Sequence, residues 1–297
     1  MKILFLSSWF PNKLEPTNGN FVQRHAEAVA MKHDVEILHT IGDFDQKEIY
    51  VFDDKVINGI RTLVIYYKNS QNPIQNFIRR MKAYKMGFAK MQKPDLVHAN
   101  VLHNNMLFAV YLKKKFKIPF VVTEHWTALR KINQDSTSGS VKKIAKFIGN
   151  QSSMILPVSN DLKISLAKLG ITTPMQVIPN VVDTQLFEPI NSTHNDFTFV
   201  HISNLIPRKN ADKILNVAIK LLKEGYQLKL KIGGDGETNT LREVVTKERF
   251  ENQIEVFDTL TLPEVSEKLK TSDCFILFSN DENQPCVIAE SFASGIK

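Results

Sequence analysis

The sequence contains only two cysteines, Cys274 and Cys286, among 297 residues, and their separation matches no metal-binding or redox motif. So few thiols are typical of a reducing compartment, and we expect a cytoplasmic protein. No run of about 18 apolar residues is present, so no membrane-spanning helix is predicted. The apolar run near the start, Ile3–Leu6, is short and no small-residue cleavage site follows it. We therefore predict a buried strand there rather than a signal peptide.

The loop after this first strand lacks a Gly-x-Gly-x-x-Gly motif, which argues against a nicotinamide or flavin dinucleotide. The loop does contain Gly19, directly before an expected helix over 21–32. A glycine at that position permits a left-handed turn or the close approach of the backbone to a ligand. The loop alone does not decide between the two.

Short β-rich runs alternate with helical stretches along the chain, which is typical of α/β domains with parallel sheets. A polar stretch over 184–196 is the expected linker, and it gives two domains, 1–190 and 191–297. The second domain is expected to hold four strands, fewer than the roughly six of a complete mononucleotide-type domain. The expected strands are 3–7, 35–39, 60–67, 96–99, 120–123, 154–158 and 176–178, and then 197–203, 227–232, 254–257 and 274–277.

The two parts of the chain differ in charge. Residues 1–190 hold 25 Lys and Arg against 15 Asp and Glu, whereas residues 191–297 hold 13 against 16. Six of the basic residues lie in 74–93, together with an apolar stripe at helical spacing that begins with Ile74, Phe77 and Ile78. Two interpretations remain open: an ordinary helix with its apolar side on a sheet, or a surface that docks on anionic lipid headgroups. No nucleic-acid recognition motif accompanies the charge, so no nucleic-acid partner is expected.

Two glutamates with seven residues between them lie near the end of the sequence. Glu282 falls in a polar loop, and Glu290 in an expected helix with Pro285 at its first position. A helix N-terminus attracts phosphate, and a carboxylate on either side of it accepts hydrogen bonds from hydroxyls. The combination suits a nucleotide sugar, but a pair of solvated charges at a helix end would show the same spacing.

Two other loops of the second domain have a similar character. Arg208 and Lys209 lie between a strand and a helix, where they can neutralise a diphosphate; solvated charges at a helix start are the alternative. Gly234 and Gly236 follow the strand 227–232, either near a nucleotide or as a plain turn. In the first domain, His98, His103 and His125 lie near the carboxyl ends of strands, where open α/β sheets bind ligands.

No metal site is expected. The histidine spacing is not that of a helix-borne zinc pair. Residues 43–45, Asp-Phe-Asp, have the form of a metal–diphosphate signature, but they lie far in sequence from the nucleotide loops. We assign no role to this tripeptide.

These segments resemble the retaining glycosyltransferases of family 4, which carry an E-x7-E motif in the second domain of a GT-B fold. The resemblance implies an α/β protein with two Rossmann-like domains and parallel sheets facing a cleft. It also implies a second domain that is incomplete, because the sequence stops at Lys297, where the family has proline. Asn204 replaces the arginine of the family's G-R-x-x-x-x-K motif, with Arg208 as its substitute. The matching segments, in the family's order, are the Gly19 loop, 123–125, 180–183, 208–209, 233–236 and 282–290.

The family resemblance implies that a sugar is transferred from a nucleoside-diphosphate donor to a hydroxyl, with retention at the anomeric carbon. His125 and Glu282 are the implied catalytic residues. The implied donor-binding residues are Gly19, Arg208, Lys209, Gly234, Gly236 and Glu290. Neither a metal nor a further cofactor is implied.

The implied acceptor is a glycan or a lipid-linked molecule at the inner membrane face, with 74–93 as a peripheral contact. Two alternatives stay open: a nucleotide-sugar epimerase of the same fold, and a truncated, non-catalytic fragment that binds a nucleotide or a partner.

Overall fold

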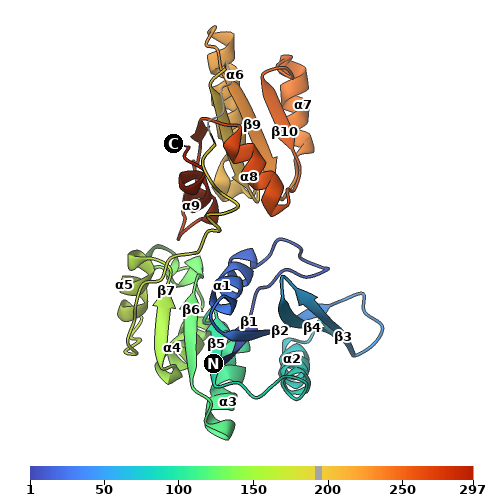
Figure 1. Ribbon diagram of the computed structural model, residues 1–297, viewed down its shortest axis with the longest axis vertical. Coiled ribbons are helices and arrows are strands. Elements are labelled where there is room, and N and C mark those ends of the chain that lie inside the picture. Colours follow the sequence, from blue (N-terminus) through green and yellow to red (C-terminus); the bar gives the residue numbers. More distant parts are fainter. Residues whose placement is uncertain (191–195, 297) are drawn as a thin grey trace. The chain divides into compact units, whose positions relative to one another are not determined.

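The computed structural model describes residues 1–190 and 196–296, and the chain divides into two compact units, Met1–Val181 and Val182–Lys297 (Figure 1). The division precedes the boundary expected after residue 190. Phe187 explains the difference, because it is only 1% exposed and packs in the core of the second unit. Residues 184–190 of the expected linker therefore belong to the second unit, and residues 191–195 lie outside the described residues.

The first unit is built on a seven-stranded sheet in the order β3-β4-β2-β1-β5-β6-β7. Every neighbouring pair is parallel except β3 and β4, which are antiparallel. The predicted parallel sheet is confirmed, and the antiparallel edge pair is an addition that the sequence analysis did not include. The strands are β1 (Lys2–Ser7), β2 (Asp34–Asp43), β3 (Tyr50–Ile57), β4 (Ile60–Lys68), β5 (Leu96–Asn100), β6 (Phe120–Glu124) and β7 (Met154–Pro157).

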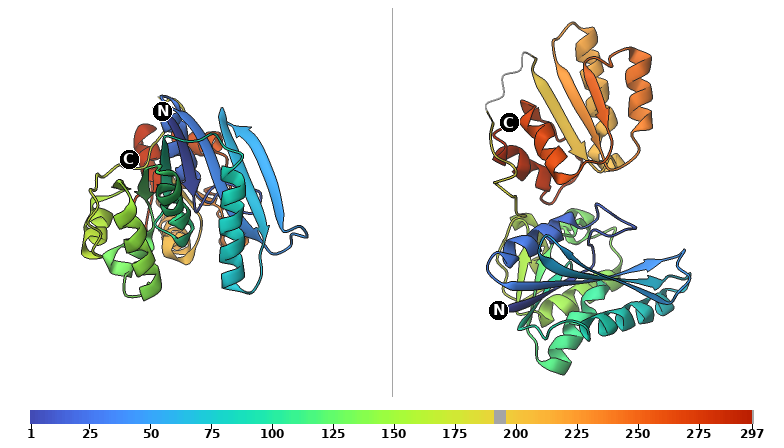
Figure 2. Two further views of the ribbon diagram at one scale, coloured as in Figure 1. Left: turned by 90° about the horizontal axis from the view of Figure 1, so that it is seen from below. Right: turned by 45° about the vertical axis from the view of Figure 1, so that its right-hand side comes forward.

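Helices cover both faces of this sheet (Figure 2). Leu4 and Leu6 of β1 share a core with α2, α3, α4 and α5, whereas Ile3 and Phe5 share a second core with α1. This is the alternation that a strand buried on both faces requires. The helices are α1 (Asn20–Ala30), α2 (Pro73–Phe88), α3 (Leu107–Phe116), α4 (Gly139–Gln151) and α5 (Asn160–Lys168), and the 3-10 turns are η1 (Asn104–Met106), η2 (Thr127–Leu129) and η3 (Lys131–Asn133).

β3 is the strand that the sequence analysis missed. It is joined to β4 by Asn58 and Gly59, which both have positive φ, 48° and 79°. An Asn-Gly pair in this conformation forms the two-residue turn that suits a twisted hairpin. Residues 176–178, in contrast, are not a strand; in this region Met175 forms only an isolated bridge to Ile155.

The packing of helix α2, which the sequence analysis left open, is settled only in part by its apolar stripe. Asn72 caps it, accepting hydrogen bonds from the backbone of residues 74 and 75. Its buried side consists of Ala83, Tyr84 and Gly87, while Ile74 and Ile78 are 70% and 60% exposed. A Cβ on Gly87 would lie 2.5 Å from Leu38 Cδ1, so this side is the one that packs closely on the sheet.

The second unit has a four-stranded, fully parallel sheet in the order β10-β9-β8-β11. The four strands predicted for this part of the chain are confirmed. One core lies under α6 and α7, and another joins Phe187 to α8 and α9. The elements are β8 (Thr198–Ser203), η4 (Pro207–Lys209), α6 (Ala211–Lys223), β9 (Lys229–Gly234), α7 (Asn239–Glu248), β10 (Ile254–Phe257), α8 (Leu262–Lys270), β11 (Cys274–Phe275) and α9 (Cys286–Ala293).

Candidate functional site

Three loops of the second unit meet at the carboxyl edge of its sheet. They follow β8, β9 and β11, and β8 lies between the other two strands. The loops contain five of the residues singled out from the sequence: Arg208, Lys209, Gly234, Gly236 and Glu282. The carboxyl edge of a parallel sheet is where ligands bind in open α/β folds.

Lys209 and Arg208 both contact Glu282. The Lys209 ammonium forms an ion pair with Glu282 Oε1, and Arg208 Nη1 lies 3.3 Å from the same oxygen. Lys209 is 9% exposed, so it is not the solvated charge of the alternative interpretation. Burial raises the pKa of Glu282, but the hydrogen bond and charge of Lys209, with Ser279 and Arg208, together lower that pKa below its ordinary value. Two cations against one carboxylate leave the group with a net positive charge.

Asn210 links the loop after β8 to the loop after β11 by hydrogen bonds. It caps α6 with a left-handed backbone, φ 52°, and its side-chain amide donates to the Phe278 carbonyl (2.7 Å) and to Asn280 Oδ1 (2.8 Å). The Asn280 backbone donates in turn to the Arg208 carbonyl, 2.9 Å away. The position of Lys209 relative to Glu282 is therefore set by backbone contacts as well as by the ion pair.

The glycines at the end of β9 and in the loop after it occupy positions where a Cβ atom would clash with neighbouring atoms. A Cβ on Gly234 (φ 135°) would lie 1.9 Å from the Ser203 carbonyl oxygen, and one on Gly236 (φ 154°) 2.9 Å from Leu205 Cβ. The Asp235 backbone donates to the Ser203 carbonyl at 3.1 Å. The two loops thus lie against each other, and the glycines contribute only backbone to the contact.

Glu290 lies on α9, which begins at Cys286 with Pro285 as its N-cap rather than as its first residue. The side chain is 1% exposed. Its position therefore differs from that of Glu282, which is partly exposed in the loop. The two glutamates are near each other in sequence, and Glu282 contacts both cations.

His201 is a residue of this site that the sequence analysis missed. It is buried in β8, with Nδ1 2.9 Å from the Ile276 carbonyl and Nε2 2.9 Å from Ser203 Oγ. Burial lowers its pKa, so the ring is neutral and joins the ends of β8 and β11. A histidine inside a strand that is otherwise apolar, in the run Phe199–Ile202, was the available signal.

In the first unit, Gly19 and His125 lie at the carboxyl edge of the other sheet. Gly19 caps α1 with φ 73°, and a Cβ there would lie 2.3 Å from the Trp9 carbonyl. His125 follows β6; its ring lies 4.3 Å from that of Phe21 and 5.4 Å from that of His25. Burial, with the charges of His25 and His98, lowers the pKa of His125 well below its ordinary value, so the ring is neutral.

A buried carboxylate beside His125 was also missed. Glu124 accepts hydrogen bonds from the backbone N–H of Leu102 (2.5 Å) and of Trp126 (2.6 Å). It joins the loops after β5 and β6, and the turn that presents Leu102 holds Val101 at φ 69°, an uncommon conformation for a β-branched residue. Burial raises the pKa of Glu124 to about 7, although these backbone N–H groups oppose the shift.

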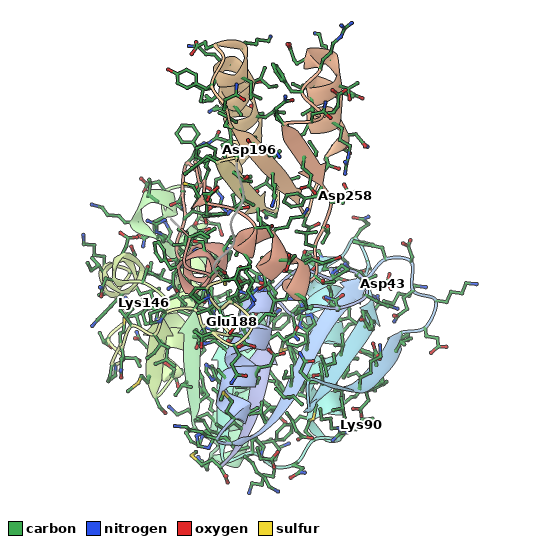
Figure 3. The ribbon with its side chains drawn as sticks, turned by 45° about the horizontal axis from the view of Figure 1, so that its top comes forward. Asp43, Lys90, Lys146, Glu188, Asp196 and Asp258 are labelled. Atoms are coloured by element: carbon green, nitrogen blue, oxygen red, sulfur yellow. The ribbon has the colours of Figure 1, made fainter. Side chains whose placement is uncertain are left out.

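The remaining histidines and the Asp-Phe-Asp tripeptide have local partners. His98 Nε2 lies 2.6 Å from Thr123 Oγ1. Asp43, at the end of β2 (Figure 3), accepts a hydrogen bond from the Asp45 backbone at 2.9 Å. In residues 1–190 and 196–296, no group of three or more His, Cys, Asp and Glu side chains could hold a metal ion.

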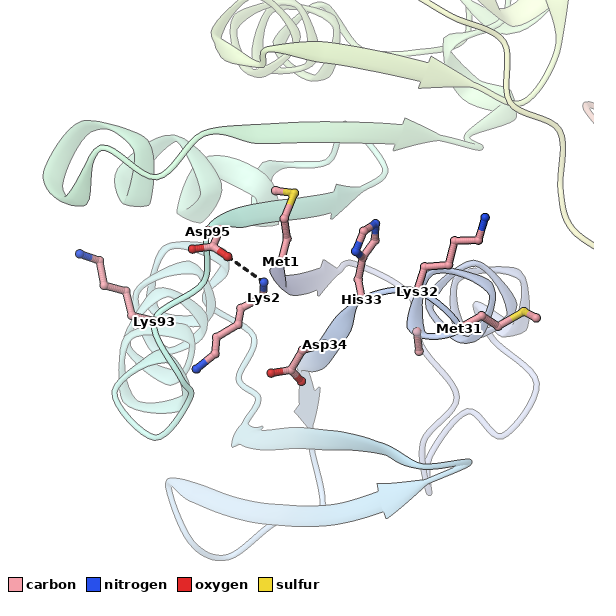
Figure 4. A pocket seen from close by; sticks show the side chains of 9 residues that line it. Met1, Lys2, Met31, Lys32, His33, Asp34, Lys93 and Asp95 are labelled. Atoms are coloured by element: carbon pink, nitrogen blue, oxygen red, sulfur yellow. Dashed lines mark hydrogen bonds between the residues drawn. The ribbon is translucent and has the colours of Figure 1, made fainter.

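A surface pocket lies at the opposite edge of the first sheet, beside the amino ends of β1, β2 and β5. There the Lys2 backbone donates to Asp95 at 2.8 Å (Figure 4). None of the predicted catalytic or donor-binding residues line it, and Lys93 of the basic segment 74–93 does. Within the described part of the chain, no helix has the length and apolar character needed to cross a bilayer.

Two families match the chain, one for each unit. Residues 19–186 match the family described as Glycosyltransferase Family 4, and residues 182–297 match the one described as Glycosyl transferases group 1. Among curated proteins, alpha-monoglucosyldiacylglycerol synthase of Streptococcus pneumoniae is 23% identical over 84% of this chain and 60% of its own length. N-acetyl-alpha-D-glucosaminyl L-malate synthase of Bacillus anthracis is 25% identical over 70% of this chain and 56% of its own. The chain thus spans about three fifths or less of these two relatives.

The solved structure of sucrose-phosphate synthase from Thermosynechococcus elongatus is similar in fold. Its TM-score is 0.73 with 13% identity, and the match covers 100% of this chain and 80% of the other. The predicted α/β fold of the GT-B type is confirmed by this likeness.

Proposed function

We propose that this chain, which belongs to Glycosyltransferase Family 4, moves a sugar from a nucleoside-diphosphate donor to a hydroxyl of a glycan or lipid-linked acceptor, with retention of anomeric configuration. The observation that carries the proposal is the group formed by Arg208, Lys209 and Glu282 at the carboxyl edge of the second sheet. A net positive group beside backbone that approaches closely is suited to a diphosphate with a sugar on one side.

In the second unit, each donor-binding residue has a proposed role. Lys209, with Arg208, holds the diphosphate and stabilises it as it leaves, so no metal ion is needed. Glu282 orients Lys209 and accepts hydrogen bonds from donor-sugar hydroxyls. Gly234 and Gly236 bring backbone close to the nucleotide, and Glu290 binds the ribose hydroxyls.

In the first unit, Gly19 allows the loop after β1 to approach the ligand. His125, as a neutral ring, contributes to the transfer step by donating a hydrogen bond. In that step the acceptor oxygen bonds to the anomeric carbon on the face from which the nucleoside diphosphate leaves with the electrons of the broken bond, and the proton of the acceptor hydroxyl passes to the departing phosphate oxygen.

Nucleotide binding tests the proposal first. Calorimetric titration of the full chain with UDP and with GDP should detect one site. Lys209→Gln should weaken binding at least about tenfold, since a hydrogen bond to a charged group contributes roughly 1.5–3 kcal/mol. Lys220→Gln is the matched control, because Lys220 is exposed on α6 and forms an ion pair with the neighbouring Glu224. Absence of binding to either nucleotide would refute the donor site.

The reaction itself is tested with donor and candidate acceptors in the presence of EDTA. The coupling constant of the anomeric proton in the product reports the configuration, and inversion would contradict the proposed retention. Incubation with the donor alone separates a transferase from an epimerase, because an epimerase changes the sugar without an acceptor.

A lipid-linked acceptor is favoured by the outer side of α2. Ile74 and Ile78 are exposed there next to Lys82 and Lys85, and the helix contains no acidic residue. Exposed isoleucines among lysines are suited to an anionic bilayer surface, where each lysine contributes about 1 kcal/mol. The pneumococcal relative is a glucosyldiacylglycerol synthase, which is in keeping with a lipid acceptor.

Vesicle sedimentation tests this contact. The protein should bind vesicles of phosphatidylglycerol and phosphatidylcholine but not of phosphatidylcholine alone. The double variant Ile74→Gln/Ile78→Gln should bind several-fold more weakly, and Ile164→Gln, an exposed isoleucine on α5, should not differ from the unchanged protein. Equal binding by the double variant would exclude α2 as the contact.

A further inference from the structure

Arg80 is held at the carboxyl edge of the first sheet by neutral groups only. Its Nε and Nη2 donate to the Tyr67 hydroxyl (3.1 and 2.8 Å), and its Nη1 donates to Asn104 Oδ1 (3.2 Å) and Asn105 Oδ1 (2.5 Å). Tyr67 lies near the end of β4, and the two asparagines begin η1 after β5. The guanidinium therefore bridges α2 to the loops at the ligand-binding edge.

No carboxylate accompanies this cation. Across residues 1–190 and 196–296, no Asp or Glu oxygen lies within 4.0 Å of Arg80, whereas Arg61 contacts both Glu36 and Asp54. The positive charge of Arg80 affects two neighbouring histidines. Burial is the largest cause of the lowered pKa values of His39 and His103, and the charge of Arg80 lowers both further. An anion that binds beside a half-buried guanidinium without a counter-ion would neutralise its charge and accept its hydrogen bonds.

Two hydrogen-bond donors at this point have no acceptor. A guanidinium has five N–H groups, and the four hydrogen bonds of Arg80 leave one of them. The Tyr67 hydroxyl accepts two hydrogen bonds, and within the described part of the chain its own proton has no acceptor. One N–H and one O–H together suit an oxygen that carries negative charge.

A series of aromatic side chains extends from this position along the sheet edge. His103, next to the asparagines, lies 5.7 Å from the Trp126 ring, and Trp126 lies 6.1 Å from Trp9. Both tryptophans of the protein belong to the first unit, and Trp126 is the one beside His103.

We propose that Arg80 and Tyr67 bind an anionic group of the acceptor, a phosphate or a carboxylate. The proposal rests on the transferase function proposed above and narrows its acceptor to an acidic molecule. It assigns to the first unit an anion site that is distinct from the diphosphate site around Lys209.

Tryptophan fluorescence is the readout, because it reports on the first unit alone. Inorganic phosphate, malonate and glycerol phosphate are titrated into the full chain, with chloride at matched ionic strength as the reference. A saturable change is expected with at least one anion, and the preferred anion distinguishes a carboxylate, a free phosphate and a lipid-headgroup phosphate.

Arg80→Gln should raise the dissociation constant at least about tenfold, as expected for loss of a charge-assisted hydrogen bond. Arg79→Gln is the matched control on the same helix, since Arg79 donates to the Lys68 carbonyl. Tyr67→Phe, which keeps the ring, should weaken binding even if Arg80→Gln fails to fold. No saturable change in the unchanged protein, or equal affinity in Arg80→Gln or Tyr67→Phe, would overturn the proposal.

Lys209→Gln separates this proposal from the donor site. It should lose UDP binding and keep the fluorescence response to the anion. A response that disappears with Lys209 rather than with Arg80 would place the anion in the second unit and contradict the inference.

Discussion

At the scale of single residues, the second unit depends on positions where no side chain fits. Gly234 is the most restricted of these, because its backbone conformation is left-handed and the Ser203 carbonyl occupies the place of a Cβ. The sequence analysis identified the glycine but left a plain turn as an alternative. What distinguishes the two is the neighbouring loop after β8, which is distant in sequence.

Gly234→Ala should destabilise the second unit by roughly 2 kcal/mol or more, through strain and displacement of the Ser203 loop. Gly139→Ala is the control, since nothing lies within 4 Å of the added Cβ at the start of α4. Urea unfolding followed by far-UV circular dichroism should show the loss. The fluorescence transition, which reports the tryptophans of the first unit, should stay unchanged; a shift in that transition would contradict the assignment to one unit.

At the scale of elements, the loop before α6 needs a residue that tolerates a left-handed backbone and whose side chain also bridges to another loop. Asn210 adopts a left-handed conformation and also bridges to the loop after β11. Asparagine tolerates that conformation better than alanine, and glycine tolerates it without strain.

Asn210→Gly should weaken UDP binding, because the two loops lose their bridge while the backbone is kept. Asn210→Ala should weaken it similarly and cost about 1 kcal/mol more in stability, because the strain is added. Calorimetry and urea unfolding measure the two effects separately. Unchanged UDP affinity in both variants would show that the ion pair alone positions Lys209.

Helix α2 shows which part of an element the sequence predicts. Spacing and charge predicted a helix in this segment. Its apolar stripe is buried at the Tyr84 end, whereas Ile74 and Ile78 at the other end are exposed. Gly87 and Ala83 allow closer packing on β2 and β4 than the isoleucines would, and that advantage depends on strands distant in sequence. The β3–β4 hairpin was predictable locally from Asn58-Gly59, whereas the pairing of β4 with β2 was not.

At the scale of the whole molecule, six histidines among residues 1–190 and 196–296 have pKa values lowered by burial; five of them are buried and His103 is half-buried. For His39 burial lowers the pKa to about 4 and for His98 to about 3. Burial also lowers the pKa values of His25, His103, His125 and His201. The buried rings are neutral at neutral pH, and protonation is easier in the unfolded chain.

The unfolded state therefore binds more protons below about pH 6.5, and the free energy of unfolding should fall as pH decreases from 6.5 toward 4. A shift like that of His39 corresponds to about 3 kcal/mol. Glu124 acts in the opposite direction, because its raised pKa favours the folded state at lower pH. Urea unfolding at pH 7 and pH 5 measures the difference, and His39→Gln should reduce it. Equal free energies of unfolding at the two pH values would show that the histidines do not dominate the pH dependence of stability.

The candidate site was predictable in part at this scale. Order along the chain and family resemblance identified the loops that carry Arg208, Lys209, Gly234, Gly236 and Glu282, and the structure brings those loops together. His201 and Glu124 were missed, because each acts by joining two loops that only the sheet order makes neighbours. Arg80 was noted only as part of a basic segment, since the absence of a carboxylate around it is a property of the folded unit.

The ion pair between Lys209 and Glu282 has a consequence for the donor site proposed above. In that proposal, a nucleoside diphosphate would compete with an internal carboxylate for the same ammonium group. The competition would limit product inhibition, since the spent nucleotide would be displaced by a group that belongs to the protein. Glu282→Gln should therefore bind UDP more tightly than the unchanged protein, even though it transfers sugar more slowly.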